Sequence, residues 1–472
     1  MENNQGPSAL LGQHKERQRL FASTDRLFLP DSVEYYDLGD ATVVIAPLLA
    51  RWCVFSHPEQ VATFKLLQTG FPVGQVLDIL RFTMSGQLAV VTMKRTLMEI
   101  EDKGFYSNAK VIERDTYACL KVNVTEGCNL RCRHCYRKSG VPLDHELETE
   151  DWVRIVEEHA TLNGTSIMVS GGEPLFRKSR TVALLSRAKE LGLETVLLTN
   201  GTLITAHTAE LLQGLLDQVQ ISLDGPDAIT NDSVRGAGVF ERVIKAIDRF
   251  KQGTLRVIIA MTPLPSTLQA FEERLGPLAT RLMSEFGERC VIQFSGGLFD
   301  GREITGLDGQ LAQRWLSRIK ALQNRIMGDG FNAKQDAASF EPGVRVAGCG
   351  YGDSLTVEAD GRVLACRRAH DPVVADIRGH SLTEVRMRLR SLATRISVDR
   401  SPVCAACSWR YLCGGSCRFE PTVDTERKDT VSTRSAPDAG DVPSVPGCDG
   451  RLKRQLCRRL VDLNPFRYQS FE

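Results

Sequence analysis

The chain has 472 residues, enough for two or three domains, and 42% of them are hydrophobic, so a sizeable core can form. Its 59 Lys and Arg residues nearly balance its 58 Asp and Glu residues, which argues against nucleic acid or a membrane surface as a partner. No apolar run reaches the roughly 18 residues of a membrane span, and the N-terminus lacks the layout of a signal peptide. We therefore expect a cytoplasmic protein.

Residues 1–114 form the first predicted domain. The stretch 33–55 is typical of β-strands, and 58–70 has the periodicity of a helix. These patterns predict a small α+β region, and none of its residues points to a particular chemistry.

A repeat of strands and helices follows, and we assign it to residues 115–340. Helical periodicity is clear at 149–162, where Thr149 is the expected N-cap, and it recurs between the later strands. Such a repeat predicts a parallel sheet covered by helices, with ligand-binding residues at the C-terminal ends of the strands. The expected strands lie at 117–124, 165–170, 194–200, 217–225, 255–261 and 289–297.

The 14 cysteines are distributed unevenly. A cytosolic chain keeps its thiols reduced, so we expect metal binding rather than disulfides where they cluster. Cys53, Cys119 and Cys290 stand alone and are expected to be small buried hydrophobic residues. One cluster consists of Cys128, Cys132 and Cys135. The other occupies the last quarter of the chain and contains Cys349, Cys366, Cys404, Cys407, Cys413, Cys417, Cys448 and Cys457.

The spacing C-x3-C-x2-C in the first cluster directly follows the first strand of the repeat. Thiolates favour zinc, copper(I) or iron–sulfur clusters. A structural zinc site needs a fourth ligand, and only His134 is near, which we expect to be a packing or solvated residue. A four-iron cluster held by three thiolates would instead leave one iron open for a substrate or cofactor.

In this setting the motif resembles that of the radical S-adenosylmethionine (SAM) superfamily. Tyr136 supplies the aromatic residue after the last cysteine, and SGGEP at 170–174 resembles the motif that binds the SAM amino group. Further similar elements follow in the family's order, namely TNGT at 199–202, ISLDGP at 221–226 and DSVRG at 232–236. The resemblance implies a partial (β/α)6 TIM-like barrel between the N-terminal α+β region and a C-terminal Cys-rich iron–sulfur domain.

The resemblance also implies the cofactors and their ligands. Cys128, Cys132 and Cys135 would hold a [4Fe-4S] cluster whose fourth iron binds the methionine part of SAM. One electron from the cluster would cleave SAM to a 5′-deoxyadenosyl radical that abstracts hydrogen from the substrate. No residue is assigned a further catalytic role.

Eight other residues match the family's SAM-binding positions. Tyr136 would lie near the adenine, Ser222 would bind the ribose, and Arg235 would pair with the carboxylate. The ammonium would meet the backbone of two glycines and a carboxylate, while Asn200 and Asp224 are less specific because both could belong to plain turns. Arg235 could also be a surface residue at the start of a helix. The full set is Tyr136, Gly171, Gly172, Glu173, Asn200, Ser222, Asp224 and Arg235.

The last region, 341–472, resembles the SPASM extension, which carries two auxiliary [4Fe-4S] clusters. A hairpin is expected at 354–366, and 421–447 reads as a flexible insertion. The implied ligands of the outer cluster are Cys404, Cys407, Cys413 and Cys448, and those of the inner cluster are Cys349, Cys366 and Cys417. With only three Cys ligands, the inner cluster would have either an open site or a non-Cys ligand. Cys457 is the alternative to Cys448, and a zinc knuckle at Cys404, Cys407, Cys413 and Cys417 is the alternative to clusters there.

Relatives with this extension mostly modify peptides or proteins. The resemblance therefore implies a precursor peptide or protein as substrate, an oxidative modification or crosslink as product, and flavodoxin or ferredoxin as electron donor. The N-terminal region would either grip a peptide by strand addition or cap the barrel. Substrate contacts are expected inside the barrel and around 294–300. The alternatives are formylglycine formation on a sulfatase, a small-molecule oxidoreductase, and a non-enzymatic electron carrier or zinc-bound interaction protein.

Overall fold

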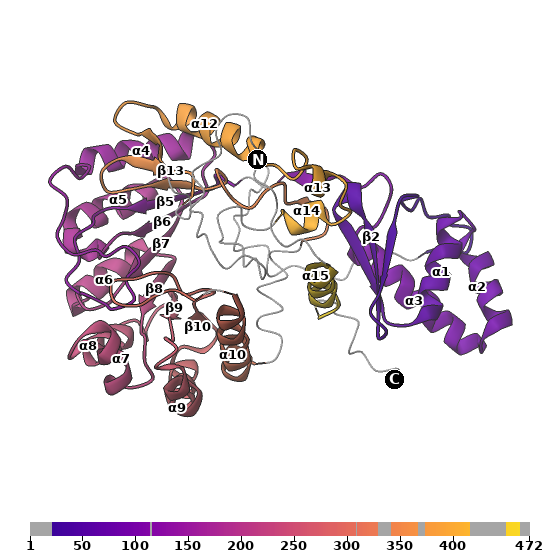
Figure 1. Cartoon of the computed structure of the whole chain (residues 1–472), viewed down its shortest axis with the longest axis horizontal. Helices are drawn as coiled ribbons and strands as arrows, with labels where there is room; N and C mark the ends of the chain where they lie inside the picture. The colour runs from indigo at the N-terminus through magenta and orange to yellow at the C-terminus, as the bar shows by residue number, and fades with distance from the viewer. Residues whose placement is uncertain are drawn as a thin grey trace, which may run out of the picture.

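The computed structural model describes residues 21–113, 116–307, 309–328, 341–366, 373–415 and 450–462. The central sheet and its helices form one end of the molecule, and the N-terminal region forms the other (Figure 1). Short C-terminal helices lie between them. None of the helices in these ranges is both long and apolar enough to cross a membrane.

The central sheet contains six consecutive parallel strands, as the repeat predicts. The buried side chains of these strands are mainly Val, Ile and Leu, and they belong to one continuous hydrophobic core. The α/β fold class is therefore confirmed, with six parallel strands at the centre of the sheet. The strands are β5 (Cys119–Asn123), β6 (Ser166–Ser170), β7 (Glu194–Thr199), β8 (Gln218–Ser222), β9 (Arg256–Met261) and β10 (Cys290–Phe294).

Helices follow each of these strands and cover the outside of the sheet (Figure 1). They are α4 (Thr149–Thr161), α5 (Lys178–Glu190), α6 (Ala206–Leu215), α7 (Ala228–Arg235), α8 (Val239–Asp248), α9 (Leu268–Phe286) and α10 (Gly309–Met327). The N-cap of α4 is Glu148 and not Thr149, so that prediction was wrong. Glu148 forms a capping box with Asp151, which satisfies two backbone donors where a threonine cap alone satisfies one.

The predicted hairpin at 354–366 is present and extends the central sheet. Its first strand, β12 (Leu355–Val357), pairs in parallel with β5, and β13 (Arg362–Leu364) and β14 (Val373–Asp376) follow. Gly361 makes the turn at φ +86°. The hairpin covers the edge that β5 would otherwise expose. After it, α12 (Leu382–Arg395) packs beside α4.

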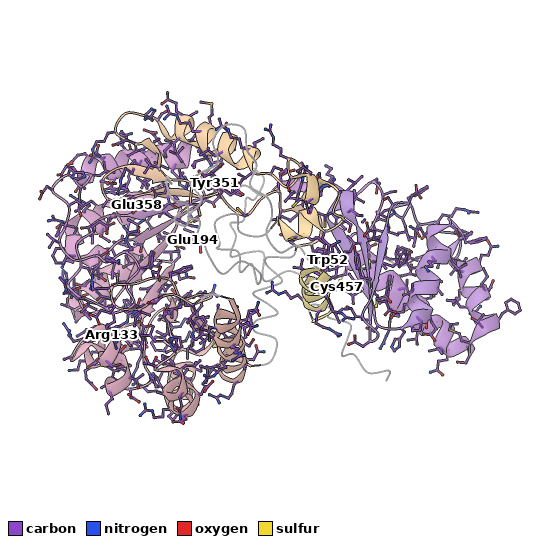
Figure 2. The ribbon with its side chains drawn as sticks, viewed as in Figure 1. Trp52, Arg133, Glu194, Tyr351, Glu358 and Cys457 are labelled. Atoms are coloured by element: carbon purple, nitrogen blue, oxygen red, sulfur yellow. The ribbon has the colours of Figure 1, made fainter. Side chains whose placement is uncertain are left out.

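The N-terminal region is a three-stranded antiparallel sheet backed by three helices. The strands are β1 (Glu34–Asp37), β2 (Thr42–Ala46) and β3 (Arg51–Phe55), and the helices are α1 (Pro58–Gln68), α2 (Val73–Thr83) and α3 (Gly86–Asp102). One face of the sheet packs on these helices. The other face packs on the Cys-rich C-terminal region, where Trp52 lies beside Cys457 of α15 (Gly450–Asp462) (Figure 2).

A buried carboxylate in this region predicts a pH dependence of stability. Glu99 is 1% exposed, and one of its oxygens accepts the Val54 N–H at 2.7 Å. Burial raises the pKa of Glu99 from 4.5 to about 7, so the folded state holds this proton more tightly than the unfolded state. Stability should therefore fall as the pH rises from about 4.5 to about 7, by up to about 3 kcal/mol from this group.

Replacing Glu99 with glutamine keeps an acceptor for Val54 and removes the titration. The variant should lose this part of the pH dependence and be more stable than the natural protein above pH 7. Unfolding midpoints measured from pH 4.5 to pH 8 would check this. Identical pH profiles for the two proteins would contradict the assignment.

Candidate active site

The three-cysteine loop begins at the C-terminal end of β5 and is closed by its own backbone. Cys128 N donates to Gly140 O at 2.9 Å, and Gly140 N donates to Glu126 O at 3.1 Å. Within the loop, Cys135 N donates to Cys132 O at 3.3 Å. These bonds place three thiols on one short segment at the edge of the sheet where parallel strands end, as the motif predicts.

The glycines of the SGGEP motif lie directly against this loop. Gly172 N donates to Thr125 O at 2.8 Å, and Glu173 N donates to Gly127 O at 2.8 Å. A Cβ atom at Gly171 would lie 2.6 Å from Thr125 O, and one at Gly172 would lie 2.5 Å from Gly127 O. Only glycine permits this approach of two backbones.

Replacing Gly172 with alanine should therefore displace the cysteine loop. Both atoms in the clash are held by backbone, so we expect a loss of about 2 kcal/mol or more in stability and weakened cluster assembly. Urea unfolding and iron content after anaerobic reconstitution would measure the two effects. Gly214→Ala is the matched control, because Gly214 is exposed in α6 with nothing near its Cβ position and alanine favours a helix. Equal stability of both variants would refute the close approach.

The carboxylate of Glu173 is fully buried and already bonded. It accepts from Leu175 N at 3.0 Å, Thr199 Oγ1 at 2.7 Å and Asn200 N at 2.7 Å. Burial raises its pKa, and these donors oppose the rise. In the structure Glu173 thus fastens the end of β6 to the end of β7. A SAM ammonium that contacts this carboxylate would have to share its oxygens with these three donors.

Asn200 and Ser222 end two neighbouring strands. Asn200 is 8% exposed, and its Nδ2 lies 3.0 Å from Asn129 Oδ1 and 3.9 Å from Cys128 Sγ. Its Oδ1 accepts from the N–H and hydroxyl of Thr202. Asn200 therefore holds the start of the cysteine loop, which a plain turn residue would not do. Ser222 is half-buried at the end of β8.

Asp224 and Arg235 meet behind the loop. Arg235 Nε donates to Asp224 Oδ2 at 2.7 Å, and both residues are buried. Burial alone would lower the pKa of Arg235, but Asp224 and the nearby thiols Cys132 and Cys128 raise it. His134 joins this pair, with its Nε2 3.1 Å from Asp224 Oδ2. Arg235 is thus not a surface residue, and it lies at the end of α7 rather than at the start of a helix.

The thiols themselves need a positive partner to ionise. Burial raises the pKa of Cys128 to about 11 and also raises that of Cys132, although Arg235 acts against it there. Iron bound to a thiol removes the proton outright. Tyr136, beside the last thiol, is 54% exposed and leaves an aromatic surface next to the site.

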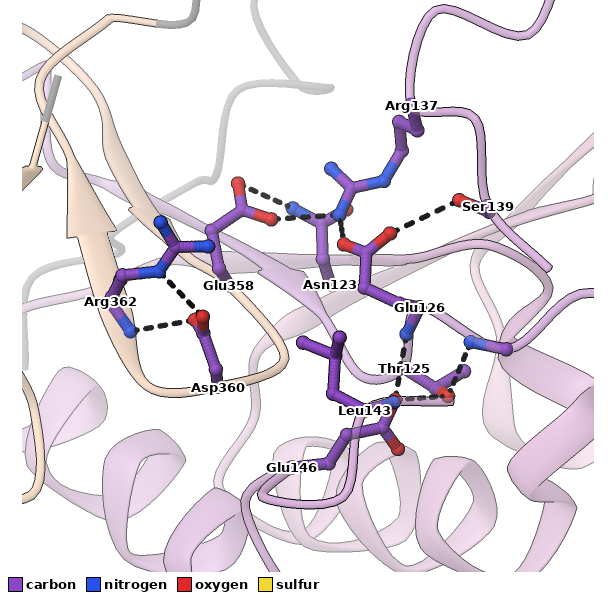
Figure 3. A network of polar contacts seen from close by, with 11 residues as sticks. Asn123, Thr125, Glu126, Arg137, Ser139, Leu143, Glu146, Glu358, Asp360 and Arg362 are labelled. Atoms are coloured by element: carbon purple, nitrogen blue, oxygen red, sulfur yellow. Dashed lines mark hydrogen bonds and ion pairs between the residues drawn. The ribbon is translucent and has the colours of Figure 1, made fainter. Parts of the chain in front are cut away.

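A buried charge network braces the loop from the other side (Figure 3). Arg137 lies between Glu126 and Glu358, and its Nη2 is 2.8 Å from Glu358 Oε2. Glu358 follows β12 and also accepts from Asn123 Nδ2 at 3.3 Å. The C-terminal hairpin is thus connected to the cysteine loop through one guanidinium.

The segment 295–307 after β10 folds back over the loop, which the sequence did not predict. Glu303 N donates to Arg133 O at 2.8 Å, and the two side chains pair at 3.0 Å. Gly301 lies so near the backbone of His134 that a Cβ atom would be 2.7 Å away. The residues that cover the cysteine loop thus directly follow 294–300, where substrate contacts are expected.

The C-terminal cysteines divide between two hydrophobic clusters. Cys349 and Cys366 pack against the central core. Cys404, Cys407, Cys413 and Cys457 belong to the cluster that packs on the N-terminal sheet. The two segments approach each other at Gly414, whose Cβ position is 2.7 Å from Gly348 O. Cys417, Cys448 and the insertion 421–447 lie outside the described residues.

The donor set of the cysteine loop fits a four-iron cluster. Three soft thiols share one loop, and a cation and a glycine cradle lie beside them. Within the described ranges, no three His, Cys, Asp or Glu side chains lie close enough together to hold a single metal ion. A cluster does not require this, because each thiolate binds a different iron.

Residues 122–275 match the family model described as the radical SAM superfamily. Fe-coproporphyrin III synthase of Methanosarcina barkeri is 32% identical over 165 residues, 34% of this chain and 41% of that protein. Probable GTP 3′,8-cyclase of Methanosarcina acetivorans is 27% identical over 296 residues, 58% of this chain and 85% of that protein. Streptococcus suis SuiB bound to S-adenosylmethionine superposes with a TM-score of 0.49 at 16% identity, over 83% of this chain and 95% of SuiB.

The match to Fe-coproporphyrin III synthase spans less than half of that protein's length. The two curated relatives are also named for different reactions, so similarity alone assigns no substrate. By the match to the family model, residues 122–275, which contain the three-cysteine loop, are a radical SAM superfamily domain.

Proposed function

We propose that this enzyme abstracts hydrogen from a peptide substrate and installs an oxidative modification or crosslink. The radical SAM family implies a [4Fe-4S] cluster and SAM, which when bound supply a one-electron cleavage of SAM and a radical able to take hydrogen. Cys128, Cys132 and Cys135 would hold the cluster. The backbone of Gly171 and Gly172 would receive the SAM ammonium, and Tyr136 would cover the adenine.

The remaining residues of the site act by position. Glu173 and Asn200 fasten the ends of β6 and β7 to each other and to the cysteine loop. The segment 295–307 covers the loop and restricts the access of water, which a radical reaction requires. Ser222, at the end of β8, would reach the ribose.

The C-terminal cysteines would hold two auxiliary [4Fe-4S] clusters. The division of these cysteines between two hydrophobic clusters favours one inner and one outer set, and Cys349 and Cys366 would belong to the inner set. Cys457 is buried together with Cys404 and so remains a ligand candidate beside Cys448. The auxiliary clusters would accept the electron that remains on the substrate after hydrogen abstraction.

The observation that favours a peptide is an open sheet edge in the N-terminal region. Leu38 N donates to Ala41 O, and hydrogen-bonded pairs alternate with non-bonded pairs along an antiparallel ladder. The N–H and C=O groups of Tyr35 and Asp37 therefore point away from β2. Among the described residues, no other backbone bond reaches them. An extended peptide can pair with such an edge.

The opposite edge of the same sheet is partly closed. Val54 N of β3 donates to Glu99, and Ala50 O next to β3 accepts from Gly343 N at 2.9 Å. We therefore place the peptide on β1, while a purely structural role would need no open edge.

A small-molecule substrate is the second proposal. It is favoured by the curated relatives, which are named for reactions on coproporphyrin and GTP. Protein maturation of the sulfatase type is the third.

Co-expression of the enzyme under low oxygen with each small peptide encoded beside its gene would test the proposal. Intact mass should fall by about two units per event, because each new C–C, C–S or C=C bond removes two hydrogens. Tyr35→Pro removes one outward backbone donor of β1 and should slow the modification. A proline at exposed Val90 of α3 would break that helix, so it cannot serve as the control. Val90→Ala is therefore the control. Unchanged masses of every such peptide would refute the peptide proposal in favour of a small molecule.

A further inference from the structure

Arg235 touches the cysteine loop at a sulfur atom. Its Nη1 lies 4.0 Å from Cys132 Sγ, and the residue is only 8% exposed. Its Nε is already engaged by Asp224 at 2.7 Å. The guanidinium therefore spans a carboxylate and a thiol, and it meets the thiol with its positive end.

The carboxylate that holds Arg235 cannot turn away. Asp224 has no exposed surface, and its Oδ1 accepts from Thr262 N at 2.7 Å. Its Oδ2 receives Arg235 and lies 3.1 Å from His134 Nε2. Both oxygens are thus occupied by residues from three separate segments of the chain, so the orientation of the guanidinium is fixed before any cofactor binds.

The helix that carries Arg235 is also fixed to the loop. Val234 O, at the end of α7, accepts from Arg133 N at 3.0 Å. In the middle of α7, Gly225 packs so tightly on the helix that a Cβ atom would lie 2.2 Å from Asn231 N. Consecutive residues of α7 therefore contact consecutive residues of the loop, one through the backbone and one through the guanidinium.

We propose that Arg235 tunes the cluster and does not serve only as a partner of the SAM carboxylate. Its cation beside Cys132 stabilises the extra electron of the reduced cluster and so raises its reduction potential. Hydrogen bonds and charge at the cysteine sulfurs set the potentials of such clusters, and a fixed charge acts strongly in a buried site. Asp224 and His134 are positioning residues for this guanidinium. The inference rests on the proposed function, because it requires a cluster on Cys128, Cys132 and Cys135.

A redox titration followed by EPR, in the absence of SAM, tests this. The signal to follow is the one that Cys132→Ala removes, so it belongs to this cluster. Arg235→Gln should shift its midpoint potential downward, and Arg235→Lys, which keeps the charge but cannot bond both partners, should shift it less. Arg133→Gln is the control, because Arg133 lies in the same loop in an exposed pair with Glu303.

Three results are distinguishable. A lower potential in Arg235→Gln without SAM supports the proposal. An unchanged potential in both Arg235 variants, with only SAM affinity reduced, overturns it and leaves Arg235 as a carboxylate partner. A natural protein that shows no signal dependent on Cys132 refutes the proposed function itself. If Arg235→Gln does not fold, Arg235→Lys alone decides between the first two results.

Discussion

Replacing Cys132 with alanine is expected to abolish SAM cleavage. The three thiolates of the loop would hold three irons, and loss of one would leave a second iron without a protein ligand. Removal of residues that merely support a ligand already costs 10- to 100-fold in metal affinity, so loss of the ligand itself should reduce 5′-deoxyadenosine release by at least about a hundredfold. Release after dithionite addition, quantified by liquid chromatography, would measure it.

The matched control is Cys119→Ala. Cys119 begins β5, the strand that leads into the cysteine loop, and it is partly exposed. This variant should keep cluster and activity. Iron content should fall by about four atoms per chain in Cys132→Ala, because a four-iron cluster is lost and any auxiliary clusters remain. Full 5′-deoxyadenosine release by Cys132→Ala would contradict the assignment of the loop.

Replacing Arg137 with leucine should produce the largest loss of stability. Arg137 neutralises Glu126 and Glu358, and its own side chain is 8% exposed while that of Glu358 is 7% exposed. Removing one partner of a buried ion pair leaves charge in the interior and typically costs about 3–5 kcal/mol. Urea unfolding followed by tryptophan fluorescence would measure the loss, since Trp152 of α4 is buried in the same core.

Arg133→Leu is the control for this prediction. Arg133 lies four residues earlier in the loop and pairs with Glu303, and both side chains are about half exposed, at 44% and 55%. An exposed pair contributes about 0–1 kcal/mol. Losses of equal size in the two variants would show that the network of Figure 3 does not brace the loop.

The α/β fold and the grouping of the motifs follow from local sequence signals. Each strand of the repeat is a short apolar run, and each motif directly follows one, so parallel pairing brings the motifs to one edge. The hairpin at 354–366 also follows from a local signal, because Asp360 and Gly361 define its turn. These signals need no knowledge of distant residues.

Contacts between distant segments could not be predicted in this way. Pairing of β12 with β5 joins residues more than 200 positions apart, and a strand of only three residues, Leu-Thr-Val, does not specify its partner. The same holds for the N-terminal sheet, which is buried on both faces. Trp52 and Val54 pack into the cluster with the C-terminal region, and Cys53 between them packs into the cluster with the helices. Alternation of this kind shows that both faces are apolar but not what covers them.

The roles of individual polar residues depend equally on distant partners. Glu173 and Asp224 were expected to contact SAM because of their motifs, and the structure shows both fully buried in bonds to neighbouring strands and loops. Arg235 was placed by its motif near the SAM carboxylate, and its contact with Cys132 depends on the packing of α7. Their assignments as SAM ligands stay predictions.

The origin of the hydrogen in 5′-deoxyadenosine tests the central claim most directly. A peptide that changes mass on co-expression would be prepared in perdeuterated form and incubated with reconstituted enzyme, SAM and dithionite. We expect 5′-deoxyadenosine heavier by about one mass unit, because the hydrogen that it gains comes from the peptide. Unlabelled 5′-deoxyadenosine formed while the peptide is modified would contradict hydrogen abstraction from a peptide by this enzyme.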